Sequence, residues 1–140
     1  MKALIYIGNL SYNFNNDEWD SFRGESRPLL NMGFGLTTLG YDVNIVCKEW
    51  DISTKKTWNN VELSNLPLYE YYDIIITHAE FPTDFNVKFE KFICLVYEER
   101  DITNIINYEK KTGIKITYVI QHNNKNRIQK IKNIAKSENV

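Results

Sequence analysis

The sequence predicts an α/β fold with a doubly wound, mostly parallel sheet of five to six strands and helices on both faces. Two observations lead to this prediction. Short apolar runs alternate with helical patterns along the chain, and most of these runs are continuously apolar rather than alternating. Continuous runs are typical of strands that are covered on both faces, as in a parallel sheet. Alternating strands and helices imply right-handed crossovers between neighbouring strands.

The predicted strands are rich in β-branched and aromatic residues, which favour a pleated sheet over a helix. They are Ala3–Gly8, Val43–Cys47, Asp73–Thr77, Phe92–Tyr97 and Ile114–Ile120. The last run begins with alternation, so we expect it to lie nearer an edge of the sheet. Val61–Leu66 is a candidate for a further short strand, and the polar segment Lys48–Asn60 is expected to be a surface loop.

The helical patterns lie between and after these strands. They are Ser26–Leu39, Asp84–Lys91, Asp101–Lys111 and Asn126–Lys136. Gly40 and Gly113 are expected to end the first and third of these helices, and Asp101 is the expected N-cap of the third. Gly33 and Gly35 lie inside the first helix, where each costs about 1 kcal/mol relative to Ala. We expect a close approach of that helix to the sheet to offset this cost.

Length and composition indicate a single domain over residues 1–140. The chain has a net charge of -1 and 43% hydrophobic residues, as in an ordinary globular domain. The near-neutral charge argues against nucleic acid as a partner. Met1 leads into a strand-like run rather than a signal peptide, and no apolar run approaches the ~20 residues of a membrane span, so a cytoplasmic location is expected. Cys47 and Cys94 are interpreted as buried hydrophobic residues rather than a redox pair.

Polar side chains follow four of the predicted strands, at the edge where open α/β sheets bind ligands. They are Gly8-Asn9 with the later stretch Gly24-Glu25-Ser26-Arg27, His78 with Glu80, Glu98-Glu99-Arg100, and Gln121-His122-Asn123. We therefore expect substrate-binding and catalytic residues among these groups.

The start of the first helix favours an anion. Pro28 fits the first turn, because its missing N–H breaks no intrahelical hydrogen bond there, and Ser26 is a suitable N-cap. The N–H groups of the first turn, the helix dipole and Arg27 together favour a phosphate group. The alternative is that Ser26 only caps the helix and that Arg27 is solvated.

Alternatives also stay open for the other candidate residues. Glu98 or Glu99 suits general-base chemistry if its carboxylate points into the cleft, but the pair also suits the dipole of the helix that follows. His78 and His122 are either substrate contacts or structural residues. The spacing of histidines and cysteines predicts no metal site, and no dinucleotide or P-loop motif is present, so no cofactor is expected. The basic residues of the last helix are interpreted as a solvated face, with a membrane-surface role as the minor option.

The stretch "MKALIYIGNL…RGESRPLLNMGFGLTTLGYDVNIV" resembles the N-terminal domain of GT-B glycosyltransferases of the group 1, or family 4, type. Gly24, Glu25 and the phrase "LTTLGYDVNIV" match the family's glycine loop and the strand that follows it, although Arg23 replaces the first glycine of that loop. "YYDIIITHAE" is similar to a further strand of the family and places His78 at the matching strand end. The similarity covers about the first 100 residues of the chain.

This resemblance implies a Rossmann-like, acceptor-side half of a retaining, metal-independent enzyme that uses a nucleotide-sugar. Its implied partners are the nucleotide-sugar, a sugar or lipid acceptor, and a C-terminal donor-binding domain or subunit, without which the chain is not expected to transfer sugar. The expected catalytic contacts are His78 and Glu98. The expected substrate or phosphate contacts are Gly8, Asn9, Gly24, Glu25, Ser26, Arg27 and His122. The alternative function is a non-catalytic, flavodoxin-like module that binds a nucleotide or a protein partner.

Overall fold

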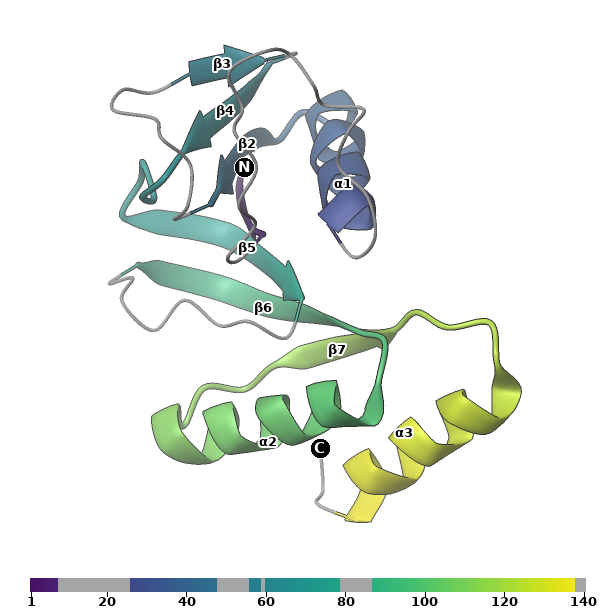
Figure 1. Cartoon of the computed structure of the whole chain (residues 1–140). Helices are drawn as coiled ribbons and strands as arrows, with labels where there is room; N and C mark the ends of the chain where they lie inside the picture. Colours follow the sequence, from purple (N-terminus) through teal and green to yellow (C-terminus); the bar gives the residue numbers. More distant parts are fainter. Residues whose placement is uncertain (8–25, 48–55, 59, 79–86, 138–140) are drawn as a thin grey trace.

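A computed structural model confirms the α/β class and shows a seven-stranded sheet with helices on both faces (Figure 1). The structure describes residues 1–7, 26–47, 56–58, 60–78 and 87–137. The strands are β1 (Lys2–Tyr6), β2 (Asp42–Val46), β3 (Lys56–Trp58), β4 (Val61–Ser64), β5 (Tyr71–His78), β6 (Lys88–Val96) and β7 (Thr117–Ile120). The helices of the described part are α1 (Ser26–Thr38), α2 (Glu99–Thr112) and α3 (Lys125–Ser137).

The strand order places a switch point in the middle of the sheet. The order is β3-β4-β2-β1-β5-β6-β7, and all the strands except β3 run parallel to their neighbours. The six parallel strands thus follow the order 3-2-1-4-5-6 of a Rossmann-like sheet, rather than the flavodoxin-like order 2-1-3-4-5. The chain first builds outward from β1 to β4 and then returns to build from β5 to β7. In such sheets the ligand crevice lies where the direction reverses, here between β1 and β5.

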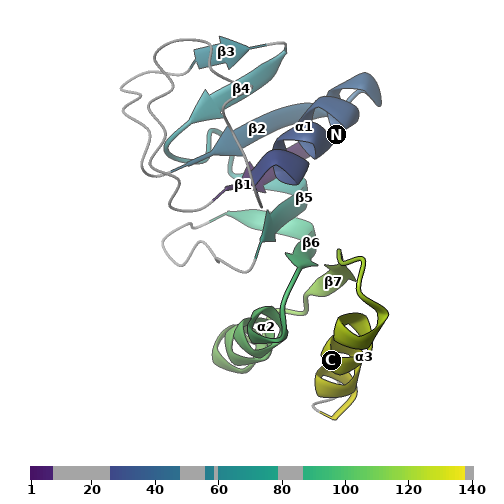
Figure 2. The ribbon, with the colours of Figure 1, turned by 45° about the vertical axis from the view of Figure 1, so that its right-hand side comes forward.

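The helices cover opposite faces because the crossovers move in opposite directions. The crossover through α1 leads toward β4, whereas the crossover through α2 leads toward β7, and right-handed crossovers in opposite directions put their helices on opposite faces. Leu29 and Leu30 of α1 pack on the face that carries Ile5. Ile102 of α2 and Ile131 of α3 pack in the cluster on the other face. In Figures 1 and 2, α1 lies over β1 and β2, and α2 and α3 lie side by side near β6 and β7.

The two glycines inside α1 have different surroundings. A Cβ atom on Gly33 would lie 3.1 Å from Cδ1 of Ile45 and 3.3 Å from Cδ1 of Ile5, so the expected close approach to the sheet is confirmed there. At Gly35 the prediction is wrong, because no atom of the described sheet lies within 4 Å of such a Cβ. Gly35 instead lines an open, mainly apolar hollow of about 470 Å³ beside Leu39, which is 75% exposed.

α1 and α2 end near the predicted glycines, but α2 begins earlier than predicted. Gly40 and Gly113 adopt φ angles of 89° and 73°, which suit glycine after a helix. The N-cap of α2 is Glu98 rather than Asp101, which occupies the third helical position. The helix begins earlier than predicted because Asp101 turns its carboxylate back to the chain before α2.

Three further segment predictions need correction. Residues 88–91 of the expected helix Asp84–Lys91 belong to β6, where Phe89 pairs with Tyr72 of β5, and residues 84–86 lie outside the described part. The strand expected at Ile114–Ile120 begins at Thr117, although its expected position at an edge of the sheet is confirmed. Within Lys48–Asn60, residues 56–58 form β3, because they pair with the edge of β4.

A buried polar cluster holds the short crossover between β4 and β5. The side-chain amide of Asn44 donates to the Glu62 carbonyl at 3.1 Å and to Ser64 Oγ at 3.0 Å. Its Oδ1 accepts hydrogen bonds from Leu68 N at 3.1 Å and from Tyr72 Oη at 2.8 Å. Asn44 therefore uses both amide hydrogens and both carbonyl lone pairs, and it is fully buried. This saturation makes Asn44 a structural residue of the core.

Candidate functional site

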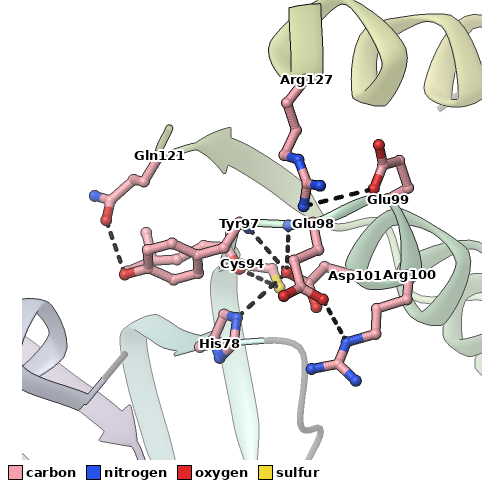
Figure 3. Close-up of polar contacts among 10 residues, drawn as sticks. His78, Cys94, Tyr97, Glu98, Glu99, Arg100, Asp101, Gln121 and Arg127 are labelled. Carbon is pink, nitrogen blue, oxygen red and sulfur yellow. Dashed lines mark hydrogen bonds and ion pairs between the residues drawn. The ribbon is translucent and has the colours of Figure 1, made fainter. Parts of the chain in front are cut away.

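The candidate site lies at the carboxyl edge of the sheet, where β5, β6 and β7 end next to one another (Figure 3). His78 is the last residue of β5, Tyr97 directly follows β6, and Gln121 directly follows β7. Because β5 pairs with β1 at the switch point, His78 borders the place where this fold binds ligands. The prediction that polar residues after separate strands share one edge is therefore confirmed for His78 and Gln121.

His78 is held by a buried carboxylate. Its Nε2 lies 3.3 Å from Oδ2 of Asp101, and the side chains of His78 and Asp101 are 13% and 4% exposed. The same Oδ2 atom accepts hydrogen bonds from the backbone N–H groups of Tyr97 at 2.8 Å and Glu98 at 2.9 Å. Figure 3 shows these three donors converging on Asp101. The strand end of β5 is thus tied to the first turn of α2.

The local sequence explains how Asp101 reaches this position. α2 begins almost directly after β6, so its first turn lies at the carboxyl edge of the sheet. An acidic side chain at the third helical position reaches back to the backbone N–H of the N-cap residue, as in a capping box. The positive end of the helix dipole also favours a carboxylate there. Helix capping and the orientation of His78 therefore depend on the same carboxylate.

The hydrogen bonds keep Asp101 ionised. Burial by itself raises the pKa of Asp101, but the hydrogen bond with His78 and those from the Tyr97 and Glu98 N–H groups outweigh burial, so the pKa falls below its ordinary value of 3.8. An ionised partner at Nε2 favours the imidazole tautomer that carries its proton on Nε2. In that tautomer the basic lone pair of His78 lies on Nδ1. The pair is thus a histidine whose ring is oriented by a buried carboxylate.

Tyr97 connects His78 with the end of β7. Its ring lies edge-on to the His78 ring, with centroids 4.6 Å apart and an interplanar angle of 77°. Its hydroxyl donates to Oε1 of Gln121 at 2.9 Å. Edge-to-face contact and a side-chain hydrogen bond both restrict ring rotation. Tyr97 therefore helps to fix the orientation of the histidine.

His122 lies at an open hollow on the same edge. Gln121, His122 and Asn123 line a cavity of about 430 Å³. Nδ1 of His122 accepts a hydrogen bond from the Asn124 N–H at 2.9 Å, and Asn124 in turn accepts one from the N–H of Asn126 at the start of α3. His122 thus orders the turn before α3, while its exposed ring borders the hollow. Its predicted role in substrate binding stays a prediction.

Glu98 and Glu99 lie at the start of α2, as expected if they complement the helix dipole rather than act in catalysis. Glu98 is the N-cap of α2, and its Oε2 lies 2.7 Å from Nε of Arg100. Oε2 of Glu99 lies 4.0 Å from Nη1 of Arg127 on α3. Figure 3 shows the two carboxylates directed toward these arginines. The catalytic role of Glu98 stays a prediction, and the geometry accounts for both residues by ion pairs and the helix dipole.

Several predicted site residues lie outside the described part of the chain. They are Gly8, Asn9, Gly24, Glu25 and Glu80, together with the side chains of Ser26 and Arg27. α1 does begin at Ser26, as expected for the helix start. The anion site at this helix start therefore stays a prediction.

Sequence reasoning missed two members of the site. The sequence pattern places Asp101 at a helix cap and Tyr97 in a strand, whereas in the structure both residues contact His78. One signal was available for Asp101, because an acidic residue three positions after the N-cap is the pattern of a capping box. The pairing with His78 has no local signal, since the two residues are 23 positions apart.

The described residues contain no group of three or more histidines, cysteines or acidic residues arranged to hold a metal ion. Cys47 and Cys94 are both buried, and no disulfide joins them, which confirms their interpretation as buried residues. Within the same residues, none of the helices is long and apolar enough to cross a membrane. Comparisons with protein-family models, curated proteins and solved structures found no match to this chain.

Proposed function

We propose that the chain is the acceptor-side domain of a nucleotide-sugar-dependent glycosyltransferase, with its substrates bound at the edge around His78. The observation that carries the proposal is the histidine–carboxylate pair at the switch point, where His78 Nε2 meets the buried Asp101. The Rossmann-like strand order supports it, because proteins with that order bind ligands at this place in the fold. The resemblance of about the first 100 residues to GT-B enzymes supplies the substrate class.

The pair suits two contacts with a sugar substrate. A neutral His78 accepts a hydrogen bond, and then a proton, from an acceptor hydroxyl. When protonated, His78 donates a hydrogen bond to a phosphate oxygen. Tyr97 limits rotation of the ring in either state. Sugar transfer would further need a donor-binding half, supplied by another domain or subunit.

The first test is a two-dimensional NMR titration with UDP- and GDP-sugars, sugar phosphates and inorganic phosphate. We expect shifts of the amide signals of His78, Tyr97 and Gln121. His78→Asn should weaken binding about tenfold, which is the loss of roughly 1.4 kcal/mol expected for one charge-assisted contact. Asn104→Ala, on the exposed side of α2, is the control and should leave the affinity unchanged.

A second test addresses the start of α1. Arg27→Ala should weaken binding of a phosphorylated ligand in calorimetry while circular dichroism shows an intact fold, because Arg27 supplies a positive charge beside the helix N-terminus. Unchanged affinity would count against the role of Arg27. Unchanged affinity in both Arg27→Ala and His78→Asn would count against this edge as the substrate site.

A further inference from the structure

The charges of the chain are strongly segregated. The segment of residues 102–137, here called the basic segment, contains seven lysines, one arginine and a single acidic residue, Glu109. Its net charge is therefore +7, although the whole chain has a net charge of -1. The remaining residues must then carry a net charge of -8. Because the total conceals this asymmetry, near-neutrality of the chain says little about the partner of the segment.

The folded structure leaves these charges exposed on two helices that pack together. α2 and α3 lie side by side in Figures 1 and 2. Lys125, Lys132 and Lys136 are exposed, and their spacing of seven and then four residues places them along one side of α3. Lys110 and Lys111 add exposed charges in the last turn of α2. The core side of α3 is formed by other residues, such as the buried Ile131.

We propose that the basic segment binds the surface of an anionic lipid bilayer, with the stripe Lys125, Lys132 and Lys136 facing the headgroups. Clusters of four to eight basic residues attract anionic lipid surfaces with about 1 kcal/mol per residue. α2 and α3 expose no large hydrophobic side chain in the described structure. Binding is therefore peripheral and electrostatic, without insertion of a helix, and it weakens as salt screens the charges.

The composition of the segment favours lipid headgroups over nucleic acid. Arginine, which recognises phosphates and bases by paired hydrogen bonds, is represented by Arg127 alone, and Arg127 pairs with Glu99. Tyr108 and Tyr118, the two tyrosines of the segment, are half-buried, so neither presents a fully exposed ring for base stacking.

Vesicle co-sedimentation tests this proposal with the whole chain. Vesicles of phosphatidylcholine containing about one-third phosphatidylglycerol should bind the protein at low salt, and pure phosphatidylcholine vesicles should not. Lys132→Gln/Lys136→Gln should weaken binding about 30-fold, which corresponds to roughly 1 kcal/mol for each lysine. Lys88→Gln/Lys91→Gln removes two exposed lysines of β6 and should change binding less than about twofold. Circular dichroism checks that all variants are folded.

The outcomes separate the possible partners. Salt-sensitive binding that is lost in the α3 variant and kept in the β6 variant supports the proposal. Equal losses in both variants, or equal binding to neutral vesicles, overturn it. A competition arm adds duplex DNA and single-stranded RNA at the same salt concentration. If either nucleic acid displaces the protein from the vesicles at comparable phosphate concentration, the segment is a nucleic-acid surface and the lipid proposal fails. The result is independent of sugar binding at His78.

Discussion

Asn44 and Asp101 each collect several hydrogen bonds in a buried position, yet they differ in charge and in their place in the fold. Asn44 lies in the middle of the sheet, and its four hydrogen-bonding positions are filled by neutral groups of β4, β5 and the crossover between them. Asp101 lies at the carboxyl edge, and one of its three donors is the titratable ring of His78.

This difference separates a structural polar cluster from a candidate site. A neutral, saturated cluster has no proton or hydrogen bond to exchange, so it only specifies the path of the chain. An ionised carboxylate beside a histidine can respond to pH and to a bound anion. Burial and hydrogen bonding are similar in the two clusters, and position near the switch point together with an ionised carboxylate distinguishes the Asp101 cluster. Four substitutions test this comparison.

Asn44→Leu should have the largest effect, a loss of about 3–4 kcal/mol in the free energy of unfolding. The variant leaves Tyr72 Oη without its acceptor and Ser64 Oγ without a donor inside the core, and each unsatisfied buried group costs about 1–3 kcal/mol. Urea denaturation measures the loss. Asn104→Leu on the exposed side of α2 is the matched control, with an expected change below about 0.5 kcal/mol. A loss in Asn44→Leu below about 1 kcal/mol would show that the cluster is dispensable.

Asp101→Asn should cost about 1–3 kcal/mol at pH 7, because hydrogen bonds to a charged acceptor are replaced by weaker neutral ones. The pKa of Asp101 is lower in the folded chain than its ordinary value of 3.8, so its charge stabilises the fold above that pH. This stabilisation is lost as the pH falls through the folded-state pKa. The stability difference between the two proteins should therefore shrink below about pH 4. A difference that is constant between pH 7 and pH 3 would contradict the assigned ionisation.

Tyr97→Phe should cost about 1 kcal/mol, the net value of a hydrogen bond such as that from Tyr97 to Gln121. The ring contact with His78 is kept, so the NMR signals of Gln121 should shift more than those of His78. Tyr118→Phe on the neighbouring strand β7 provides a control in a half-buried position. If the free energy of unfolding falls equally in both variants, the Tyr97–Gln121 hydrogen bond does not stabilise the fold beyond the effect of removing any half-buried tyrosine hydroxyl.

Glu98→Gln should have the smallest effect, below about 0.5 kcal/mol. The side chains of Arg100 and Glu98 are 75% and 39% exposed, and exposed ion pairs contribute little because water screens them. The backbone N–H of Glu98, which donates to Asp101, is unchanged by the substitution. Thermal unfolding at low and high salt measures the effect. A loss above about 1 kcal/mol would indicate that this carboxylate supports the site beyond its pair with Arg100.

The predictions that succeeded rest on local patterns. The continuous apolar runs around Ile5 and Ile45 indicated strands covered on both faces, and Gly40 and Gly113 marked helix ends through the conformation that glycine alone adopts easily. The helix expected at Asp84–Lys91 failed because strand pairing with β5 outweighed a short local pattern. Gly33 and Gly35 are both glycines of α1, and only the packing of the folded chain shows that Gly33 contacts the sheet and Gly35 does not.

By itself the sequence determined the alternation of strands and helices and the polar residues that follow the strands, because hydrophobic periodicity and glycine geometry act between near neighbours. Only the tertiary structure shows the order of the strands, the switch point beside His78 and the contact between His78 and Asp101. Those features depend on contacts between residues far apart in the chain, and the energy of such contacts leaves no periodic trace in the sequence.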